Sequence, residues 1–264
     1  MIAAGVDIGA GTSKAVLVDE GGRVVAKISQ KSGARLDLAG ALAFAAVLEK
    51  AGLSRDDISY IASTGYGRYQ LPDRDIQITE VTCHARGASY LFPGTRCLVD
   101  IGAQSTRAIR IDDRGKVLRF KMNDRCAAGA GRFLERVARA LEIPIDDLGP
   151  LSLRSSDPQA ISSICAVLAE SEVINLVTSG KATEDILMGA HLSIAERALA
   201  LLRQVGVDGE VTVTGGVVQN PGMLKALEQR LGKRVNASPD SVYAGAIGAA
   251  LLGLVRLRKR GEAR

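Results

Sequence analysis

An internal repeat constrains the fold of this chain more than any other feature of its sequence. The segment VDIGAGTSKAVLVDEGGRVV, residues 6–25, aligns without a gap to VDIGAQSTRAIRIDDRGKVL, residues 99–118. Nine of the twenty positions are identical and eight more are conservative exchanges, whereas chance gives about one or two identities in a stretch of this length. The chain therefore contains the same structural unit twice.

Each copy predicts three short strands joined by two turns. A β-branched strand ends in an aspartate, Asp7 or Asp100, and a turn of small residues leads to a second strand with alternating apolar residues. A charged turn, DEGG at 19–22 or DDRG at 112–115, leads to a third strand. Two copies in register predict two lobes, each presenting a phosphate-facing hairpin to a shared cleft.

The small-residue turns contain the candidate phosphate contacts. Glycines allow backbone N–H groups to approach an anion, and hydroxyl and amino groups add further donors. One such turn alone is weak evidence, because a surface hairpin has a similar composition, but two copies in register are much more specific. The candidates in the two turns are Gly9, Gly11, Thr12, Ser13, Lys14, Gly102 and Ser105.

The rest of the sequence alternates helices and strands, as in an α/β protein. Apolar patterns predict helices at 38–53, near 79–90, 129–142, 166–179 and 184–204, and strands at 58–63 and 210–216. Gly215 and Gly216 end the last strand, and Pro221 suits the first turn of a helix whose N-terminus faces a ligand.

The lobes have no Pro- or Ser-rich linker between them. We expect a first lobe at 1–95 and a second at 96–240, with a C-terminal helix at about 241–260 that packs back on the first. Tyr66 and Arg68 follow a predicted strand, in a loop position that favours binding. His84 and His191 are expected to be packing or surface residues rather than ligands.

Composition argues against two classes of partner. The net charge is +5 and the pI is about 9.1, but basic residues are interspersed with acids and aromatic residues are 3%. We therefore expect no nucleic-acid partner. The N-terminus lacks a charged leader, and the apolar run 244–255 is too short to span a bilayer. We expect a cytoplasmic protein without a membrane partner.

The four cysteines contain no CxxC pair, so we expect reduced thiols. Cys126 in NDRCAAGAGRF and Cys165 in SSICAVLAES stand where a turn ends and an apolar helix begins. A helix N-terminus favours the thiolate, but two thiolates do not fill a tetrahedral metal site. Cys83 and Cys97 lie within predicted elements and are expected to be core residues.

The order of the motifs resembles the superfamily of actin, Hsp70 chaperones and sugar kinases. Within it, nearly the whole chain resembles the ATP-dependent activators of 2-hydroxyacyl-CoA dehydratases and the ATP-binding subunits of benzoyl-CoA reductases. The resembling stretches are VDIGAGTSK, STGYGR, CHARGAS, DIGAQSTR, KMNDRCAAGAGRFLE, SSICAVLAESEVI, TGGVVQNPG and YAGAIGAAL. The resemblance implies an α/β fold of two lobes, the actin/Hsp70-like ATPase fold with ribonuclease H-like halves.

The resemblance also implies ATP and Mg²⁺ as ligands. Asp7 and Asp100 would orient Mg²⁺-bound waters and the attacking water, with help from Gln104, while the turn residues hold phosphate oxygens. The residues that would border adenosine are Gly215, Gly216, Gln219 and Asn220.

One [4Fe–4S] cluster shared by two subunits is a further implication of the resemblance. Cys126 and Cys165 would supply two of its four thiolates. A homologous ATP-binding subunit, or a second copy across a pseudo-twofold axis, would supply the others. ATP would drive electrons from a low-potential donor such as ferredoxin to an acyl-CoA-binding reductase or dehydratase subunit.

Particular stretches favour the reductase branch. DIGA, HARGA, DDRGKV, SICAVLAE and PDSVYAGAIGAAL look more like the small ATP-binding subunit of benzoyl-CoA reductase, a component of anaerobic aromatic degradation. STGYGR and MNDRCAAGAGRF also resemble the homodimeric activators, whose second loop reads DIGGQD where this chain has Ala103 and Ser105. The alternatives are a homodimeric activator, a small-molecule kinase with Asp124, Glu170 or Glu172 as base, and a non-catalytic ATP switch.

Overall fold

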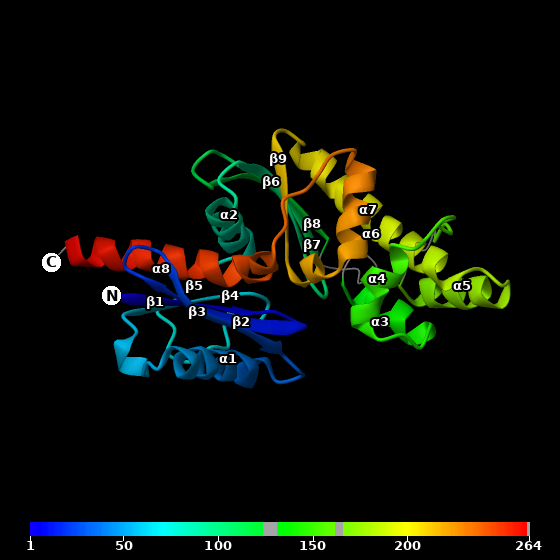
Figure 1. Ribbon diagram of the computed structural model, residues 1–264. Coiled ribbons are helices and arrows are strands. Elements are labelled where there is room, and N and C mark those ends of the chain that lie inside the picture. The colour runs from blue at the N-terminus through cyan, green and yellow to red at the C-terminus, as the bar shows by residue number, and fades with distance from the viewer. Residues whose placement is uncertain (124–130, 162–165, 263–264) are drawn as a thin grey trace. The chain divides into compact units, whose positions relative to one another are not determined.

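The computed structural model describes residues 1–123, 131–161 and 166–262, and these residues form two β-sheets with helices (Figure 1). The chain divides into two compact units. Unit 1 comprises Met1–Arg96, Ile111–Leu118 and Asp240–Arg264, and unit 2 comprises Cys97–Arg110 and Arg119–Pro239.

The sheet of unit 1 has five strands in the order β3-β2-β1-β4-β5. β1 pairs antiparallel with β2 and parallel with β4, so the first repeat forms one edge of the sheet and a later strand extends it. The strands are β1 (Ile2–Ile8), β2 (Thr12–Asp19), β3 (Val24–Lys31), β4 (Tyr60–Thr64) and β5 (Ile76–Gln77).

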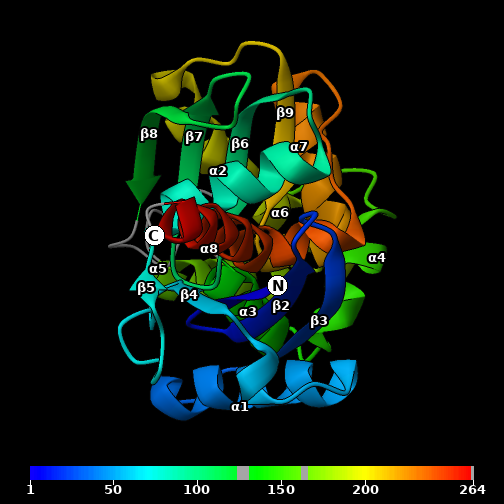
Figure 2. The same cartoon turned by 90° about the vertical axis from the view of Figure 1, so that its left-hand side faces the viewer.

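Helices cover both faces of this sheet, with α1 (Leu36–Ala51) on one side and α8 (Ala244–Glu262) on the other (Figure 2). Side chains alternate along a strand, so Ala4 and Val6 of β1 pack in the core that contains α1, while Ala3 packs against α8. Asp7 follows the same alternation and therefore lies on the α8 face of the sheet.

The helices α2 (Glu80–Leu91) and α8 contact each other through small residues. A Cβ atom on Gly87 would lie 1.9 Å from the Ala244 carbonyl oxygen, and one on Gly248 would lie 1.8 Å from the Cys83 carbonyl oxygen. The two helices thus approach to backbone contact, which only glycine permits.

The second sheet has the strand order β8-β7-β6-β9, and most of it belongs to unit 2. Its antiparallel pair β6–β7 places Asp100 opposite Arg107, as β1–β2 places Asp7 opposite Lys14. The structure therefore confirms that the sequence repeat is a repeat of the same paired strands. The strands are β6 (Thr95–Ile101), β7 (Thr106–Ile111), β8 (Val117–Asn123) and β9 (Glu210–Thr214).

The helices of unit 2 pack on one another as α6 with α4 and α7, and α3 with α5. They are α3 (Gly131–Ala140), α4 (Leu148–Ser152), α5 (Ala166–Thr178), α6 (Thr183–Val205) and α7 (Pro221–Leu231). Pro221 is the first residue of α7, as the sequence predicts, and the Asn220 side chain caps the helix by accepting from the Met223 N–H at 3.0 Å.

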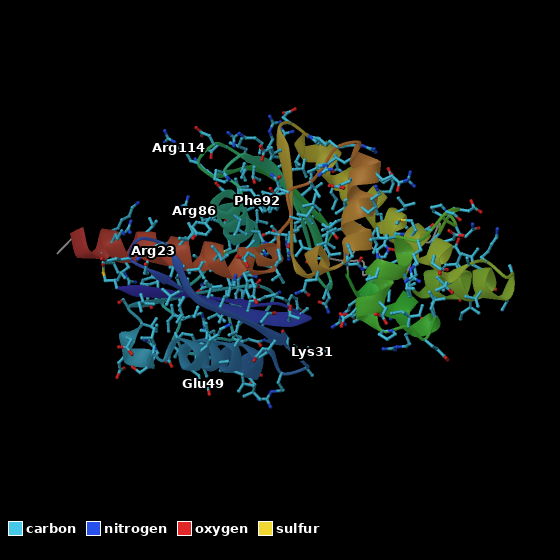
Figure 3. All side chains as sticks on the ribbon, viewed as in Figure 1. Arg23, Lys31, Glu49, Arg86, Phe92 and Arg114 are labelled. Carbon is cyan, nitrogen blue, oxygen red and sulfur yellow. The ribbon has the colours of Figure 1, made fainter. Side chains whose placement is uncertain are left out.

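The charged turns of the repeat also have matching geometry. The Asp19 side chain accepts from the Arg23 N–H, and the Asp112 side chain accepts from the N–H groups of Arg114 and Lys116. These backbone hydrogen bonds are the largest cause that lowers the pKa of both carboxyls below its usual value. Asp19 and Asp112 are partly exposed in these turns, and charged side chains such as Arg23, Lys31 and Glu49 point away from the core of unit 1 (Figure 3).

One helix within the described residues, Pro239–Arg260, is long and apolar enough to cross a membrane by length and composition. It is longer than the apolar run 244–255 from which the sequence predicts no membrane span. The share of its apolar window that is buried inside the protein is 67%, and its residues Ile247 and Ala250 pack against β1 and β2. It is accordingly a core helix of unit 1.

Candidate active site

The first candidate loop joins β1 to β2 in unit 1. The Gly9 N–H donates to the Thr12 carbonyl oxygen at 3.2 Å and closes the turn. The ammonium group of Lys14 donates to the same carbonyl at 3.3 Å. The loop residues Gly9, Gly11 and Thr12 are partly exposed, so their backbone groups can reach a ligand.

Ser13 lies differently from its neighbours in this loop. It is fully buried, and its hydroxyl is 2.8 Å from the Ser32 hydroxyl, which in turn donates to the Gly9 carbonyl at 2.7 Å. Ser13 lies on the same face of β2 as Ala15 and Leu17, which pack in the core that contains α1, so alternation turns its side chain inward. The Ser13 hydroxyl therefore stabilises the loop from its buried side, through Ser32.

The second candidate loop joins β6 to β7 in unit 2 and has the same closure. The Gly102 N–H donates to the Ser105 carbonyl oxygen at 2.9 Å, and residues Gly102 to Ser105, including Gln104, are partly exposed. The N–H groups of Gly131 and Arg132, the first residues of α3, donate to the carbonyls of Gly102 and Ala103 at 2.8 and 2.9 Å. The start of α3 is therefore bonded directly to this loop.

The two aspartates of the repeat differ in their charge partners. Asp100 is 2% exposed, and the Arg107 guanidinium donates to its Oδ2 at 2.6 Å, while the Thr214 hydroxyl lies 3.3 Å from its Oδ1. Asp7 is 5% exposed, and within the described residues no ion pair joins it to a cation. Lys14 takes the place of Arg107 in the repeat, but it turns to the loop carbonyl instead.

Two residues beyond the aligned repeat extend the equivalence of the two sites. Gly65 follows β4 and Gly215 follows β9, and both have positive φ values, of 92° and 88°. A Cβ on Gly65 would lie 2.5 Å from Asp7 Oδ1, and a Cβ on Gly215 would lie 2.8 Å from Asp100 Oδ1. Each aspartate thus lies against the backbone of a glycine after a neighbouring strand.

The threonines that precede these glycines were not singled out from the sequence. Thr64 and Thr214 are both fully buried, and Thr64 stands in register with Asp7 on the parallel strands β1 and β4. The signal that could have found them is the shared Thr-Gly pair after each strand, in STG at 63–65 and VTG at 213–215. His84, interpreted from the sequence as a packing or surface residue, is buried on α2 near Asp7.

The predicted adenosine residues form a 3-10 helix, Gly216–Gln219, and the cap of α7. A side chain at Gly216 would meet open space, and Gln219 is exposed, so both are free to border a ligand. Asn220 is already engaged, because its amide lies 3.0 Å from His191 Nε2 and its oxygen caps α7. The structure brings Gly215 to Asp100 and directs the Asn220 amide to His191.

The cysteines fall into two groups. Cys83 on α2 and Cys97 on β6 are free and fully buried. Burial raises the pKa of both thiols, and that of Cys83 to about 12, so they are protonated core residues. Cys126 and Cys165 lie outside the described residues, and within the described part no cluster of three or more metal-ligating side chains occurs.

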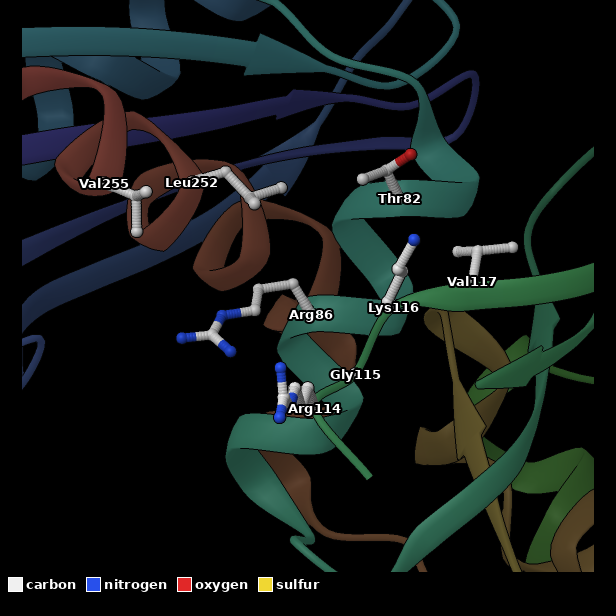
Figure 4. A pocket seen from close by; sticks show the side chains of 8 residues that line it. All are labelled: Thr82, Arg86, Arg114, Gly115, Lys116, Val117, Leu252 and Val255. Carbon is white, nitrogen blue, oxygen red and sulfur yellow. The ribbon is translucent and has the colours of Figure 1, made fainter. Parts of the chain in front are cut away.

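Unit 1 also has a hollow of about 420 Å³ (Figure 4). No predicted site residue lines it. Three cationic side chains and an apolar part of α8 surround it, and its lining consists of Thr82, Arg86, Arg114, Gly115, Lys116, Val117, Leu252 and Val255.

Comparison with known proteins agrees with the repeat and its loops. A sequence model of the BadF/BadG/BcrA/BcrD ATPase family matches residues 4–253. A benzoyl-CoA reductase subunit of Thauera aromatica is 46% identical over 98% of this chain and 95% of its own length. The activator of lactoyl-CoA dehydratase of Anaerotignum propionicum is 41% identical over 98% of this chain and 100% of its own length.

A solved structure shows the same fold. The activator of 2-hydroxyisocaproyl-CoA dehydratase from Clostridium difficile, with bound ADPNP, superposes with a TM-score of 0.95 and 37% identity. The match covers 100% of this chain and 98% of that one. The predicted family resemblance and the predicted α/β fold of the actin, Hsp70 and sugar-kinase class are thereby confirmed.

Proposed function

This chain belongs to the BadF/BadG/BcrA/BcrD ATPase family, and from that premise we propose that it hydrolyses Mg-ATP to drive low-potential electrons to a CoA-ester reductase. The observation that carries the proposal is the 46% identity to the benzoyl-CoA reductase subunit of Thauera aromatica over nearly the full length of both chains. We assign this chain as the small ATP-binding subunit of a reductase of this type.

The residues present fit ATP and a divalent cation. Each unit has a buried aspartate beside a glycine-closed loop, and Thr64 contributes a buried hydroxyl without a hydrogen-bonding N or O partner among the described residues. Mg²⁺ would supply charge neutralisation at the phosphate oxygens. Asp7 and Asp100 would hold the cation's waters, and Gln104 would orient the attacking water.

The remaining contacts belong to the loops. The backbone N–H groups near Gly9, Gly11 and Gly102, the hydroxyls of Thr12 and Ser105 and the ammonium of Lys14 would bind phosphate oxygens. Ser13 would act by holding the first loop in place, since its hydroxyl bonds Ser32. Gly215, Gly216 and Gln219 would border the adenosine, and Asn220 would fix the start of α7 beside it.

The family resemblance implies that Cys126 and Cys165 are the cluster thiolates, and the burial of the other cysteines supports this assignment. The other two cysteines are buried and protonated, and the sequence predicts that Cys126 and Cys165 each precede an apolar helix. A helix N-terminus stabilises negative charge. A [4Fe–4S] group bound there would supply one-electron transfer at low potential, and its two remaining thiolates would come from a homologous subunit or a second copy.

The second loop offers a route from the nucleotide to the cysteine segments. The hydrogen bonds from Gly131 and Arg132 to the loop carbonyls tie α3, which follows the Cys126 segment, to the residues beside Asp100. α3 packs on α5, which follows Cys165. A change in this loop on hydrolysis would therefore be transmitted to both helices. A ferredoxin-type donor would deliver the electron, and an acyl-CoA-binding subunit would receive it.

The single-cysteine variants test this assignment. Cys126→Ala and Cys165→Ala should each abolish the brown colour and the iron, because each removes a cluster ligand. Cys83→Ala and Cys97→Ala should keep the iron near the wild-type level, with a packing loss of about 1 kcal/mol. Iron and sulfide per assembly, determined without oxygen, provide the measurement. Loss of iron in Cys97→Ala with retention in Cys126→Ala would overturn the ligand assignment.

A homodimeric dehydratase activator is the second candidate. The TM-score of 0.95 to the activator of 2-hydroxyisocaproyl-CoA dehydratase, over the whole of this chain, favours an activator. An absorption spectrum recorded without oxygen would separate both electron carriers from a small-molecule kinase of this fold, since only the carriers would bind an iron–sulfur cluster.

A further inference from the structure

The carboxyl end of β1 lies in a buried polar cluster within unit 1. Asp7 is 5% exposed, Thr64 0% and His84 4%. Asp7 and Thr64 are in register on parallel neighbouring strands, so their side chains share one face of the sheet. That face is the one that α8 covers, and His84 reaches it from α2. Three polar residues from three elements therefore meet at one buried place.

Two glycines keep the space around the Asp7 carboxylate clear. A Cβ on Gly65 would lie 2.5 Å from Asp7 Oδ1. A Cβ on Gly245 would lie 2.7 Å from Asp7 Oδ2 and 2.9 Å from His84 Nε2. The imidazole nitrogen and one carboxylate oxygen thus face the same point, and any residue larger than glycine at position 245 would fill the space between them.

Buried polar groups need hydrogen-bond partners, and a buried carboxylate needs positive charge or several donors. In the second repeat, Arg107 and Thr214 meet this need for Asp100. In the first repeat, the described residues show no ion pair to Asp7, and the buried Thr64 hydroxyl has no N or O partner among them. The two sites are equivalent in backbone but not in charge, so the Asp7 side is the one arranged for an external cation.

We infer that Thr64 and His84 complete a site for a hydrated divalent cation at Asp7, as positioning residues for the water molecules that the cation carries. The inference rests on the proposed function, which brings Mg²⁺ to Asp7. Mg²⁺ keeps several of its waters in protein sites. A hydroxyl oxygen and an imidazole nitrogen can each accept a hydrogen bond from such a water, and outer-shell partners of this kind strengthen metal binding.

The neighbouring thiol does not belong to the site. Burial raises the pKa of Cys83 to about 12, and the Thr64 hydroxyl beside the thiol opposes that rise only in part. A protonated thiol is a weak hydrogen-bonding group, so it leaves Thr64 able to bond a water. Because the Cys83 thiol contacts Thr64, the suitable control is Cys97→Ala, which removes a fully buried thiol whose hydrogen bonds go to the carbonyls of Gly206 and Asp208.

Binding of Mn²⁺ to the protein–ADP complex, measured by electron paramagnetic resonance, tests the inference without relying on turnover. Thr64→Val, which removes only the hydroxyl, should weaken Mn²⁺ binding about tenfold, and Thr64→Ser should restore it. His84→Leu should weaken it similarly, while His84→Gln, which retains a polar group near the Nε2 position, should recover part of the affinity. ADP binding in the presence of a chelator should change less than about twofold in all variants, and Cys97→Ala should match the wild type.

Wild-type Mn²⁺ affinity in both Thr64→Val and His84→Leu would overturn the inference, as would an equal loss in Thr64→Ser and Thr64→Val. Valine has nearly the same shape as threonine, so the comparison of Thr64→Val with Thr64→Ser decides the question even where His84→Leu does not fold. A wild-type protein that binds no ADP would instead overturn the proposed function. Binding of ADP with normal Mn²⁺ affinity in the variants leaves that function intact and removes only the roles of Thr64 and His84.

Discussion

Arg107 gives the second aspartate of the repeat a structural role that the first lacks. Because Arg107 is buried and lies 2.6 Å from Asp100, Asp100→Asn removes the carboxylate that balances a buried charge. We expect this substitution to lower the free energy of unfolding by about 3 kcal/mol, whereas Asp7→Asn should lower it by less than about 1 kcal/mol. Urea unfolding of both variants provides the measurement, and Asp100→Asn combined with Arg107→Met should recover much of the loss.

This difference affects how turnover is interpreted. Both Asp→Asn variants should reduce ATP hydrolysis strongly, by loss of metal and water positioning, but only Asp100→Asn should also reduce stability. Hydrolysis must therefore be compared without urea, at a temperature where both variants are folded. Unchanged ATPase activity in both would contradict the assignment of the two aspartates.

His191 makes stability depend on pH. Burial lowers its pKa from 6.5 to about 4, so between these values the unfolded chain binds a proton that the folded chain does not. The stability is complete above about pH 6.5 and decreases as the pH falls towards 4. We expect a loss of about 2 kcal/mol between pH 7 and pH 5. Urea unfolding at the two pH values measures it, and His191→Gln should remove this part of the difference. An unchanged pH dependence in His191→Gln would contradict the prediction.

At the scale of secondary structure, periodic segments could be predicted and short ones could not. Helices predicted at 38–53 and 184–204 are observed at Leu36–Ala51 and Thr183–Val205, because apolar residues recur along each. α4 has five residues and β5 has two, which is too few for a periodic pattern. The 3-10 helices were missed for the same reason.

The candidate site shows a similar division between what the sequence could and could not predict. The gapless repeat paired Asp7 with Asp100 and Lys14 with Arg107. It could not reach Thr64 and Thr214, because the segments between the hairpins and these threonines differ greatly in length. The alignment also treats lysine and arginine as equivalent, although Arg107 binds its aspartate and Lys14 does not. Conservative exchange in a sequence therefore conceals a difference in charge pairing.

The hydrogen bond between the second loop and α3 can be tested by a substitution at Gly131. Gly131 is the first residue of α3, a position where proline is compatible with a helix, but Gly131→Pro removes the N–H that donates to Gly102. We expect ATP hydrolysis to persist while the nucleotide-dependent change in the rate of iron chelation decreases about tenfold. Chelation rates with and without ADP provide the measurement.

Gly131→Ala is the matched control for this experiment. It retains the N–H group, and its added Cβ atom, 3.3 Å from the Gly102 carbonyl oxygen, requires a shift of only a few tenths of an ångström, so the hydrogen bond and the nucleotide-dependent change should persist. A Gly131→Pro protein with the full nucleotide-dependent change would show that this hydrogen bond does not couple the loop to the cluster.

At the scale of the whole molecule, the supply of thiolates determines the assembly. Two of the four cysteines are protonated core residues, so one chain can offer a cluster only Cys126 and Cys165. A cluster held by four thiolates then requires two chains. We expect native mass spectrometry without oxygen to show iron only in assemblies larger than the 27.7 kDa chain.

A species of twice that mass supports the activator, because two identical chains then complete the cluster. Iron binding that needs a homologous chain of different mass supports the reductase subunit. A monomer with four irons would contradict the pairing, since two further ligands would have to come from residues that the fold keeps buried.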